Sequence, residues 1–253
     1  MSHFAVFFSA LIHDVDRRGL SGAPRIAKEQ NNDAKEDAKS QQTVVELTWE
    51  LLIEPRYKHL RSCIYSDAYE RNRFRQLLAD CVEATDVTDM ELRALRKKRW
   101  QASFSASLPT LLTPEEVNSR KATVVIELVM QMSSAAHYAQ HWNMYRKWNE
   151  RLFTEMYEVY KNGILDRDPS KGWYENEIFF FDIHVIPLAK MIKVCGVFAK
   201  SNDECLTYAL QNKKEWEMKG QELCWEMLAK DVEMEKRSDK QLHALPLSPG
   251  LLV

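Results

Sequence analysis

The stretch HFAVFFSALIHDVDRRG, residues 3–19, determines how the rest of the chain is interpreted. Its first part is almost wholly apolar, and it ends in a histidine beside an aspartate, His13 and Asp14. The apolar run from Phe4 to Ile12 has less than half of the roughly twenty residues that a helix needs to cross a bilayer. The run therefore predicts a core helix, not a membrane span, with an imidazole and a carboxylate at its inner end.

The composition favours a helical domain. The 253 residues include only 7 Gly and 8 Pro, helix-forming residues are abundant, and alternating β-branched runs are scarce. A chain of this length has room for one large core, and no internal repeat or clear boundary divides it. We therefore predict an all-α fold: one compact multi-helix domain over residues 1–238, followed by a flexible C-terminal tail over 239–253.

Charge and cysteine content narrow the function classes. The formal net charge is -2 at pH 7, and basic residues alternate with acidic ones, so the sequence predicts no nucleic-acid partner. The five cysteines form no CxxC pair, and no signal peptide precedes them. These features predict a protein with reduced thiols in the cytoplasm.

Two helices carry clear start signals. TPEE at 113–116 is a capping box, and the apolar stripe that follows it runs at helical spacing to Ser134. A second helix is predicted to begin near Asp67 and to bury a stripe that continues to Thr85 and Asp86. The second stripe predicts that a carboxylate lies in the interior at the end of that helix.

Two further helices are expected in the C-terminal half. The longest is predicted over 135–162, with one inward face formed by Tyr145, Trp148, Leu152, Met156 and Tyr160. Another begins near Asn202, and Gly220 within it predicts close contact with a neighbouring helix. The polar stretch at 31–39 is predicted to be a solvated loop.

The pair of His13 and Asp14 suits a divalent metal ion. The imidazole supplies a nitrogen ligand, and the carboxylate supplies an oxygen that can bridge two ions. Taken alone the pair is a weak signal, because a partly buried histidine beside a carboxylate also occurs as an ordinary structural pair. Longer sequence blocks are needed to separate these two readings.

Four blocks supply that context. ALIHDVDRRG at 10–19 resembles the HDVDHPG signature of the class I 3′,5′-cyclic nucleotide phosphodiesterases, an all-helical metal-dependent family. EATDVTDMELRAL at 83–95, KWNERLFTEMY at 147–157 and NEIFFFDIHVIPLAK at 176–190 are similar to later blocks of that family, in the family's order. The chain is therefore identified as a member of this family.

The resemblance implies a pocket with two divalent ions, zinc and magnesium or manganese, and a bridging hydroxide that attacks the cyclic phosphate. In that picture His13 binds the tightly held ion and Asp14 touches both ions. Asp86 corresponds to a carboxylate that supports the metal ligands, and Phe180 to the aromatic residue that stacks on the purine. Glu177 stands where the best-known members carry glutamine, so a preference for cAMP or cGMP does not transfer.

Several family residues are replaced. Ser134 holds the place of a metal-binding aspartate, Arg17 that of a second histidine, and Gln41 that of a glutamate that orients the general acid. The family's HNxxHAxDV stretch, which supplies the general-acid histidine and another metal histidine, would precede Met1, so the general acid is not assigned. We therefore expect an N-terminally truncated, degenerate copy that binds metal weakly or not at all.

Three functions follow from this reading. The first is a phosphodiesterase domain of signal transduction that hydrolyses cAMP or cGMP to the 5′-monophosphate. The second is an inactive relative that binds nucleotide or regulates a partner. The sequence does not decide whether the chain forms a homo-oligomer. The third is another phosphohydrolase with the His-Asp motif, which the ordered downstream blocks disfavour.

Other polar residues have structural interpretations. His137 and His141 are four residues apart, as in some metal sites, but core or capping roles are favoured. His184 lies in an apolar run and is expected to be an interior residue. The charged runs RKKR at 96–99 and EMEKR at 233–237 are interpreted as solvated helix faces.

Overall fold

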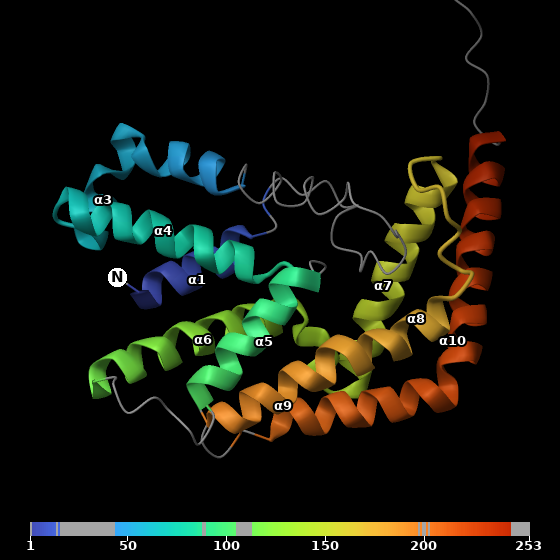
Figure 1. Ribbon diagram of the computed structural model, residues 1–253. Coiled ribbons are helices and arrows are strands. Elements are labelled where there is room, and N and C mark those ends of the chain that lie inside the picture. Colours follow the sequence, from blue (N-terminus) through green and yellow to red (C-terminus); the bar gives the residue numbers. More distant parts are fainter. Residues whose placement is uncertain are drawn as a thin grey trace, which may run out of the picture.

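The structure is a computed structural model that describes residues 2–13, 15, 44–87, 90–104, 113–196, 198, 201 and 203–243. Every regular element in these ranges is helical, so the all-α prediction is confirmed (Figure 1). Three predicted site residues, Asp14, Arg17 and Gln41, lie outside the described residues, as do the predicted loop and the last ten residues. The domain boundary after residue 238 stays a prediction.

The helices of the N-terminal part of the chain pack together through small apolar clusters. This part consists of α1 (Ser2–Ile12), a helix over 44–53, η1 (Pro55–Tyr57), α3 (Lys58–Ile64) and α4 (Ala68–Ala84). Ala5, Leu52, Phe74 and Leu78 meet in one of these clusters and are almost completely buried. The helix α4 begins as predicted, because Asp67 is its N-cap and accepts a hydrogen bond from the main-chain N–H of Glu70 at 2.8 Å.

The helix α6 (Pro114–Ser134) connects the two halves of the molecule. It contacts α1 and α4 on one side, and it also contacts α5 (Met90–Phe104) and α9 (Ile186–Cys195). The predicted capping box is present: Thr113 Oγ1 accepts from the Glu116 N–H at 3.2 Å, and the Glu116 carboxylate accepts from the Thr113 N–H at 2.8 Å. The buried stripe of α6 includes Val124, Leu128 and Met132, which pack against α9.

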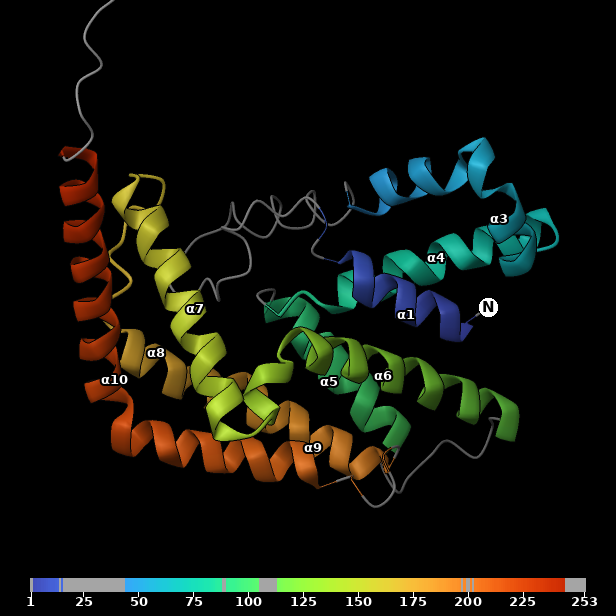
Figure 2. The same cartoon turned by 180° about the vertical axis from the view of Figure 1, so that it is seen from behind.

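The C-terminal half holds the largest aromatic cluster. Its elements are η2 (Ala136–Ala139), α7 (Trp142–Lys161), α8 (Trp173–Phe180), η3 (Phe181–Val185) and α10 (Glu204–His243). The helix α10 is bent, and its C-terminal half runs beside α7 (Figures 1 and 2). Ion pairs between described residues join these helices, among them Arg146 with Glu226 at 3.2 Å and Lys230 with Glu150 at 2.7 Å.

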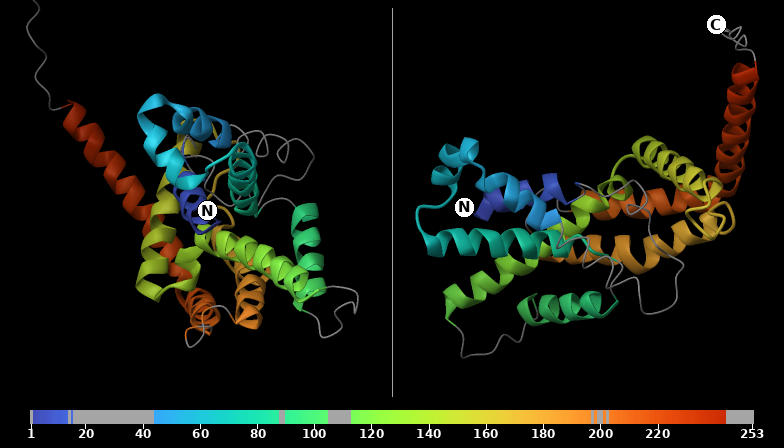
Figure 3. Two further views of the ribbon diagram at one scale, coloured as in Figure 1. Left: turned by 90° about the vertical axis from the view of Figure 1, so that its left-hand side faces the viewer. Right: turned by 90° about the horizontal axis from the view of Figure 1, so that it is seen from above.

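The helices α8 and α9 are joined by η3, which is a π-helical segment. Residues 173–195 are therefore helical without interruption, and the first half of α10 lies beside them (Figure 3). A π-helical turn shifts the side chains that follow it to another face, and such turns occur frequently at functional sites. Here the turn directly follows Phe180, one of the predicted substrate contacts.

The predicted helix over 135–162 is wrong in its first turns. Instead, η2 covers Ala136–Ala139 and α7 begins at Trp142, with the His141 side chain accepting a hydrogen bond from the Asn143 N–H at 3.3 Å. The capping role of His141 is thereby confirmed. His137 lies in η2, so the two histidines are not one turn apart on the same α-helix. The longest described helix is α10, with 40 residues.

Three burial predictions also need correction. The face of α7 that is fully buried contains Tyr145, Asn149 and Phe153, whereas Trp148 is 45% exposed. The opening helix is only partly interior, because Phe7 in α1 is 79% exposed. Residues 97–99 are solvated as predicted, but Arg96 is buried because the described C-terminal end of α4 supplies hydrogen-bond acceptors for its guanidinium.

Candidate functional site

Three predicted site residues stand at the C-terminal ends of three helices. His13 directly follows α1, Asp86 lies just after α4, and Ser134 is the last residue of α6. The three helices contact one another, and their C-terminal ends all point toward the half of the molecule that contains α7 (Figures 1 and 2). The structure therefore gathers these three positions in one region.

His13 is half-buried, and its ring Nδ1 lies 2.8 Å from the main-chain oxygen of Ala10. A carbonyl oxygen only accepts hydrogen bonds, so Nδ1 carries a proton, and in the neutral ring Nε2 then carries the lone pair. Metal-binding histidines commonly hold their ring in this way, with the second nitrogen bonded to a carbonyl or a carboxylate. The geometry of His13 is thus compatible with the predicted ligand role, whereas its companion Asp14 lies outside the described residues.

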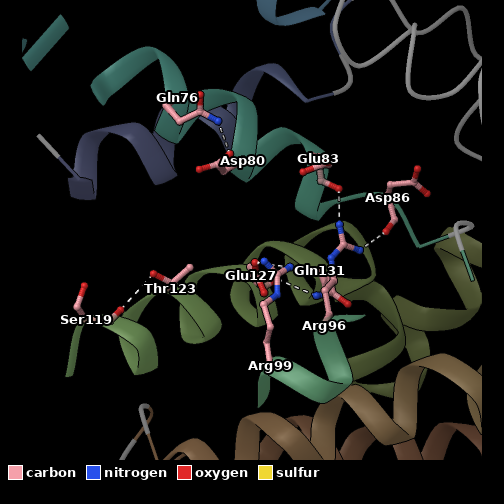
Figure 4. A network of polar contacts seen from close by, with 10 residues as sticks. All are labelled: Gln76, Asp80, Glu83, Asp86, Arg96, Arg99, Ser119, Thr123, Glu127 and Gln131. Atoms are coloured by element: carbon pink, nitrogen blue, oxygen red, sulfur yellow. Dashed lines mark hydrogen bonds and ion pairs between the residues drawn. The ribbon is translucent and has the colours of Figure 1, made fainter. Parts of the chain in front are cut away.

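Asp86 is 8% exposed, and the backbone around it is held by Arg96 of α5. The Arg96 guanidinium donates to the main-chain oxygens of Glu83 and Asp86, each at 2.6 Å (Figure 4). A cation is favourable there because the last carbonyl groups of a helix carry partial negative charge. Burial lowers the pKa of Arg96, and nearby carboxylates oppose that shift, so the side chain stays charged.

Arg96 was missed as a site residue by sequence reasoning. The sequence does contain a signal, namely the spacing of Arg93 and Arg96 by one helical turn. In the structure Arg93 also donates to a main-chain oxygen near the end of α4, that of Val87. Two arginines one turn apart, shortly after a helix end, can both reach the carbonyl groups of that end. This pair fixes the position of α5 relative to the segment that carries Asp86.

Ser134 takes part in a local hydrogen bond. Its hydroxyl donates to the main-chain oxygen of Gln131 at 2.9 Å, one turn back in α6. The side chain therefore offers a neutral oxygen whose proton is engaged, where a metal site needs an ionised carboxylate.

The metal-binding side chains in the described ranges do not fit the two bound metal ions that the family resemblance implies. Within the described ranges, no three His, Cys, Asp or Glu side chains are grouped closely enough to hold an ion. His13 and Asp86 supply one imidazole and one carboxylate, and Ser134 adds only a hydroxyl. Structural and catalytic zinc sites use at least three nitrogen, sulfur or carboxylate ligands from the protein.

The predicted substrate contacts are both in the interior. Glu177 is 1% exposed and Phe180 is 7% exposed. The Glu177 carboxylate accepts hydrogen bonds from the hydroxyl groups of Tyr138, at 3.0 Å, and Tyr145, at 2.7 Å. Burial raises the pKa of Glu177 to about 7, although the two hydroxyl groups act in the opposite direction.

Tyr138 and Asn212 are two further residues that sequence reasoning missed. The Tyr138 ring lies 5.0 Å from the Phe180 ring, between centroids. From α10, the buried Asn212 amide donates to the main-chain oxygens of Tyr138 and Gln140, at 3.0 and 2.7 Å. In a continuous helix over 135–162 the main-chain oxygens of Tyr138 and Gln140 would accept hydrogen bonds within that helix. The contact with Asn212 therefore depends on the break in the helix, which the sequence does not predict.

His184 is 4% exposed, which confirms that it is an interior residue. Its Nε2 has no hydrogen-bond partner among the described residues. Burial, followed by the charges of Arg93 and Arg96, lowers the pKa of His184 to about 4. The ring is therefore neutral at pH 7 and packs 5.0 Å from that of Phe180.

The described part of the chain is thus an all-helical domain in which a histidine, a buried aspartate and a serine stand at or just after the C-terminal ends of three helices that contact one another. The family model described as 3′5′-cyclic nucleotide phosphodiesterase matches residues 1–196. The chain belongs to this family. None of the helices in the described ranges could span a membrane.

Solved structures give the same fold. A crystal structure of the phosphodiesterase domain of the RhoPDE fusion protein from the choanoflagellate Salpingoeca rosetta has a TM-score of 0.63 and 19% identity, covering 86% of this chain and 68% of that one. A second structure, of the phosphodiesterase domain of Salpingoeca rosetta rhodopsin phosphodiesterase, has a TM-score of 0.64 and 18% identity, covering 90% and 69%. A comparison with curated protein sequences gives no match.

Proposed function

We propose that this chain is a 3′,5′-cyclic nucleotide phosphodiesterase domain that no longer hydrolyses cAMP or cGMP by itself and acts as a binding or regulatory module in the cytoplasm. Its ligand class is the cyclic nucleotide, and its partner in regulation is another protein, such as an intact relative. Zinc and magnesium or manganese are the ions of the parental reaction, and here they bind weakly or not at all.

The observation that carries the proposal is Ser134 at the end of α6. An ionised aspartate offsets the charge of a bound ion and forms a short, strong bond, whereas a serine hydroxyl supplies neither charge nor a deprotonated oxygen. The hydroxyl of Ser134 is also engaged by the Gln131 carbonyl group. Arg17 adds a permanent cation at a position where the family resemblance implies a histidine.

Metal analysis and a hydrolysis assay test the proposal together. The purified chain is expected to retain much less than one zinc ion per molecule and to release no 5′-monophosphate from cAMP or cGMP. The double variant Arg17→His/Ser134→Asp should bind zinc at least roughly tenfold more tightly than the unmodified chain, because each restored ligand or its support typically contributes 10 to 100-fold.

A matched control separates ligand geometry from added charge. Ser133 is the exposed neighbour of Ser134, and its hydroxyl also bonds to a main-chain oxygen one turn back. The variant Arg17→His/Ser133→Asp carries the same charge change and is expected to leave zinc affinity close to that of the Arg17→His single variant. Stoichiometric zinc in the unmodified chain together with hydrolysis of cAMP or cGMP would overturn the proposal and favour an active phosphodiesterase.

A further inference from the structure

We propose that Tyr138 occupies the base pocket of this domain from within, so that a purine base can enter only when η2 moves away. The inference rests on the proposed function, because it treats Phe180 and Glu177 as the residues that would face a bound nucleotide. It adds a specific side chain that closes the pocket and a second residue that holds it there.

The contacts of Tyr138 resemble those that a bound base would make. Its ring lies 5.0 Å from the Phe180 ring and 5.2 Å from the Phe181 ring, edge-on to the latter. At its far end the hydroxyl donates to Oε1 of Glu177 at 3.0 Å. A flat ring against aromatic side chains, with one N–H or O–H donor aimed at the carboxylate, is also the arrangement expected for a purine.

The burial of these side chains leaves no room for a second ring. Tyr138 is 2% exposed, Phe180 is 7% exposed and Glu177 is 1% exposed. Protein interiors are packed about as densely as organic crystals, so a purine and the tyrosine ring cannot share this space. A nucleotide therefore binds only by displacing Tyr138.

The element that carries Tyr138 is short and is held from another helix. The segment η2 has four residues and joins α6 to α7. Asn212 of α10 is completely buried, and its amide donates to the main-chain oxygens of Tyr138 and Gln140. Short 3₁₀ segments are common connectors between helices, and their hydrogen-bond geometry is poorer than that of an α-helix. Asn212 thus holds the backbone of η2 in the position in which the Tyr138 ring fills the proposed base pocket.

The ligand class follows from the walls that remain once the tyrosine ring is gone. These walls are the rings of Phe180, Phe181 and Tyr145 and the carboxyl group of Glu177, which accepts hydrogen bonds when ionised. Such a cavity takes a planar aromatic or heteroaromatic molecule that carries a hydrogen-bond donor. Phenol is the smallest such probe, and the bases of cAMP and cGMP carry donors on amino or ring nitrogen atoms.

The test compares two cavity-forming variants of the full chain. Tyr138→Ala opens the proposed pocket, whereas Phe153→Ala removes an equally buried ring of α7 that packs on Trp173 instead. Binding of cAMP and cGMP is measured by calorimetry in EDTA, which makes the result independent of catalytic metals. At least one of them should bind Tyr138→Ala no less than tenfold more tightly than the unmodified chain and Phe153→Ala.

Three further measurements keep the test decisive when the cavity variant is poorly folded. Phenol should raise the melting temperature of Tyr138→Ala more than that of Phe153→Ala, because it refills the space of the lost ring. Asn212→Ala retains the tyrosine but frees η2, and it should also increase nucleotide binding. Tyr138→Phe keeps the ring in place and is expected to bind no better than the unmodified chain.

The inference is overturned when neither Tyr138→Ala nor Asn212→Ala binds a cyclic nucleotide better than Phe153→Ala. It is also overturned when phenol stabilises Tyr138→Ala but neither nucleotide binds, because the cavity is then not a base pocket. The proposed function fails on a different measurement, namely hydrolysis and tight zinc in the unmodified chain. The two failures are therefore distinguishable.

Discussion

Glu177 is a carboxyl group in a fully buried position, and burial raises its pKa to about 7. The folded state therefore binds a proton more tightly than the unfolded state, whose carboxyl group titrates near 4.3. Folding gains from this proton below the unfolded pKa, and the gain disappears as pH rises through about 7. The contribution of Glu177 to the stability of the domain therefore falls as pH rises from about 4.3 to about 7, and it stays low above pH 7.

We predict that Glu177→Gln removes this dependence. On going from pH 5 to pH 8, the unmodified chain should lose roughly 3 kcal/mol more in free energy of unfolding than the variant, since each pKa unit corresponds to about 1.4 kcal/mol. His137 and His184, whose pKa values burial lowers to about 4, act with the opposite sign in both proteins. Urea unfolding curves at several pH values measure the difference, and parallel pH profiles would contradict the prediction.

Sequence reasoning located individual residues well where helical periodicity extended to them. Asp86 was predicted to be interior because it continues the stripe of α4, and the structure confirms its burial. Ser134 stands at the end of α6 as expected. The role of Tyr138 could not be predicted, because its contacts come from α8 and η3 and depend on a helix break that lacks a proline or glycine signal.

The capping box at the start of α6 was readable from four residues, because its hydrogen bonds are local. Thr113 and Glu116 satisfy two main-chain N–H groups that the helix cannot pair itself. We predict that Thr113→Ala lowers the free energy of unfolding by about 1 kcal/mol. Thr123→Ala, in the same helix, should change it by less than about 0.5 kcal/mol, because Thr123 is exposed and bonds only to the Ser119 carbonyl group. Thermal unfolding of both variants gives the comparison, and equal losses would contradict a capping role.

Gly220 allows α10 to approach α8, as its position in the predicted helix suggested. A Cβ atom at this position would lie 2.8 Å from the ring of Trp216 and 2.9 Å from that of Tyr174. Trp216 is 1% exposed and donates from its indole to the Tyr174 carbonyl group, so it has little room to move. The added methyl group therefore clashes with two packed rings.

We predict that Gly220→Ala destabilises the domain by about 1 to 2 kcal/mol. Overpacking of a buried site costs about 1 to 3 kcal/mol, which outweighs a gain of up to about 1 kcal/mol in helix propensity. Met218→Ala is a suitable control, because Met218 lies in the same helix and is 60% exposed. Denaturant unfolding monitored by tryptophan fluorescence reports on both variants. A stabilised Gly220→Ala protein would show that α8 and α10 are not in close contact.

Helix termini were predicted best where a side chain caps the end, and worst where tertiary contacts decide it. Asp67 and Thr113 fixed two helix starts correctly. The π-helical turn of η3 carries no local signature, because its sequence FDIHV is compatible with an ordinary helix. The start of α7 was missed although the His141 side chain caps it, because Asn212 binds the backbone of the preceding segment from 72 to 74 positions away.

The arrangement of the whole molecule depends on contacts between helices that are distant in sequence. The helix α6 contacts α1 and α4 as well as α5 and α9, and thereby links the N-terminal cluster to the C-terminal aromatic cluster. The amino-acid pattern predicted one all-α domain, but it did not predict how α5 is oriented. Arg96 helps to fix this orientation, because it lies in α5 and its guanidinium donates to main-chain oxygens at the end of α4 (Figure 4).

We predict that Arg96→Met destabilises the domain by about 2 to 4 kcal/mol. The substitution leaves the main-chain oxygens of Glu83 and Asp86 without their charged donor in a buried setting, and hydrogen bonds to charged groups contribute about 1.5 to 3 kcal/mol each. Arg99→Met is the control within the same helix, because Arg99 is 44% exposed and pairs with the partly buried carboxylate of Glu127 and not with the end of α4, so a smaller loss is expected. Urea unfolding measures the two losses, and hydrogen exchange should become faster at the end of α4 in Arg96→Met alone. Equal losses in both variants would mean that α5 is positioned by its apolar contacts with α6 and not by the cation at the end of α4.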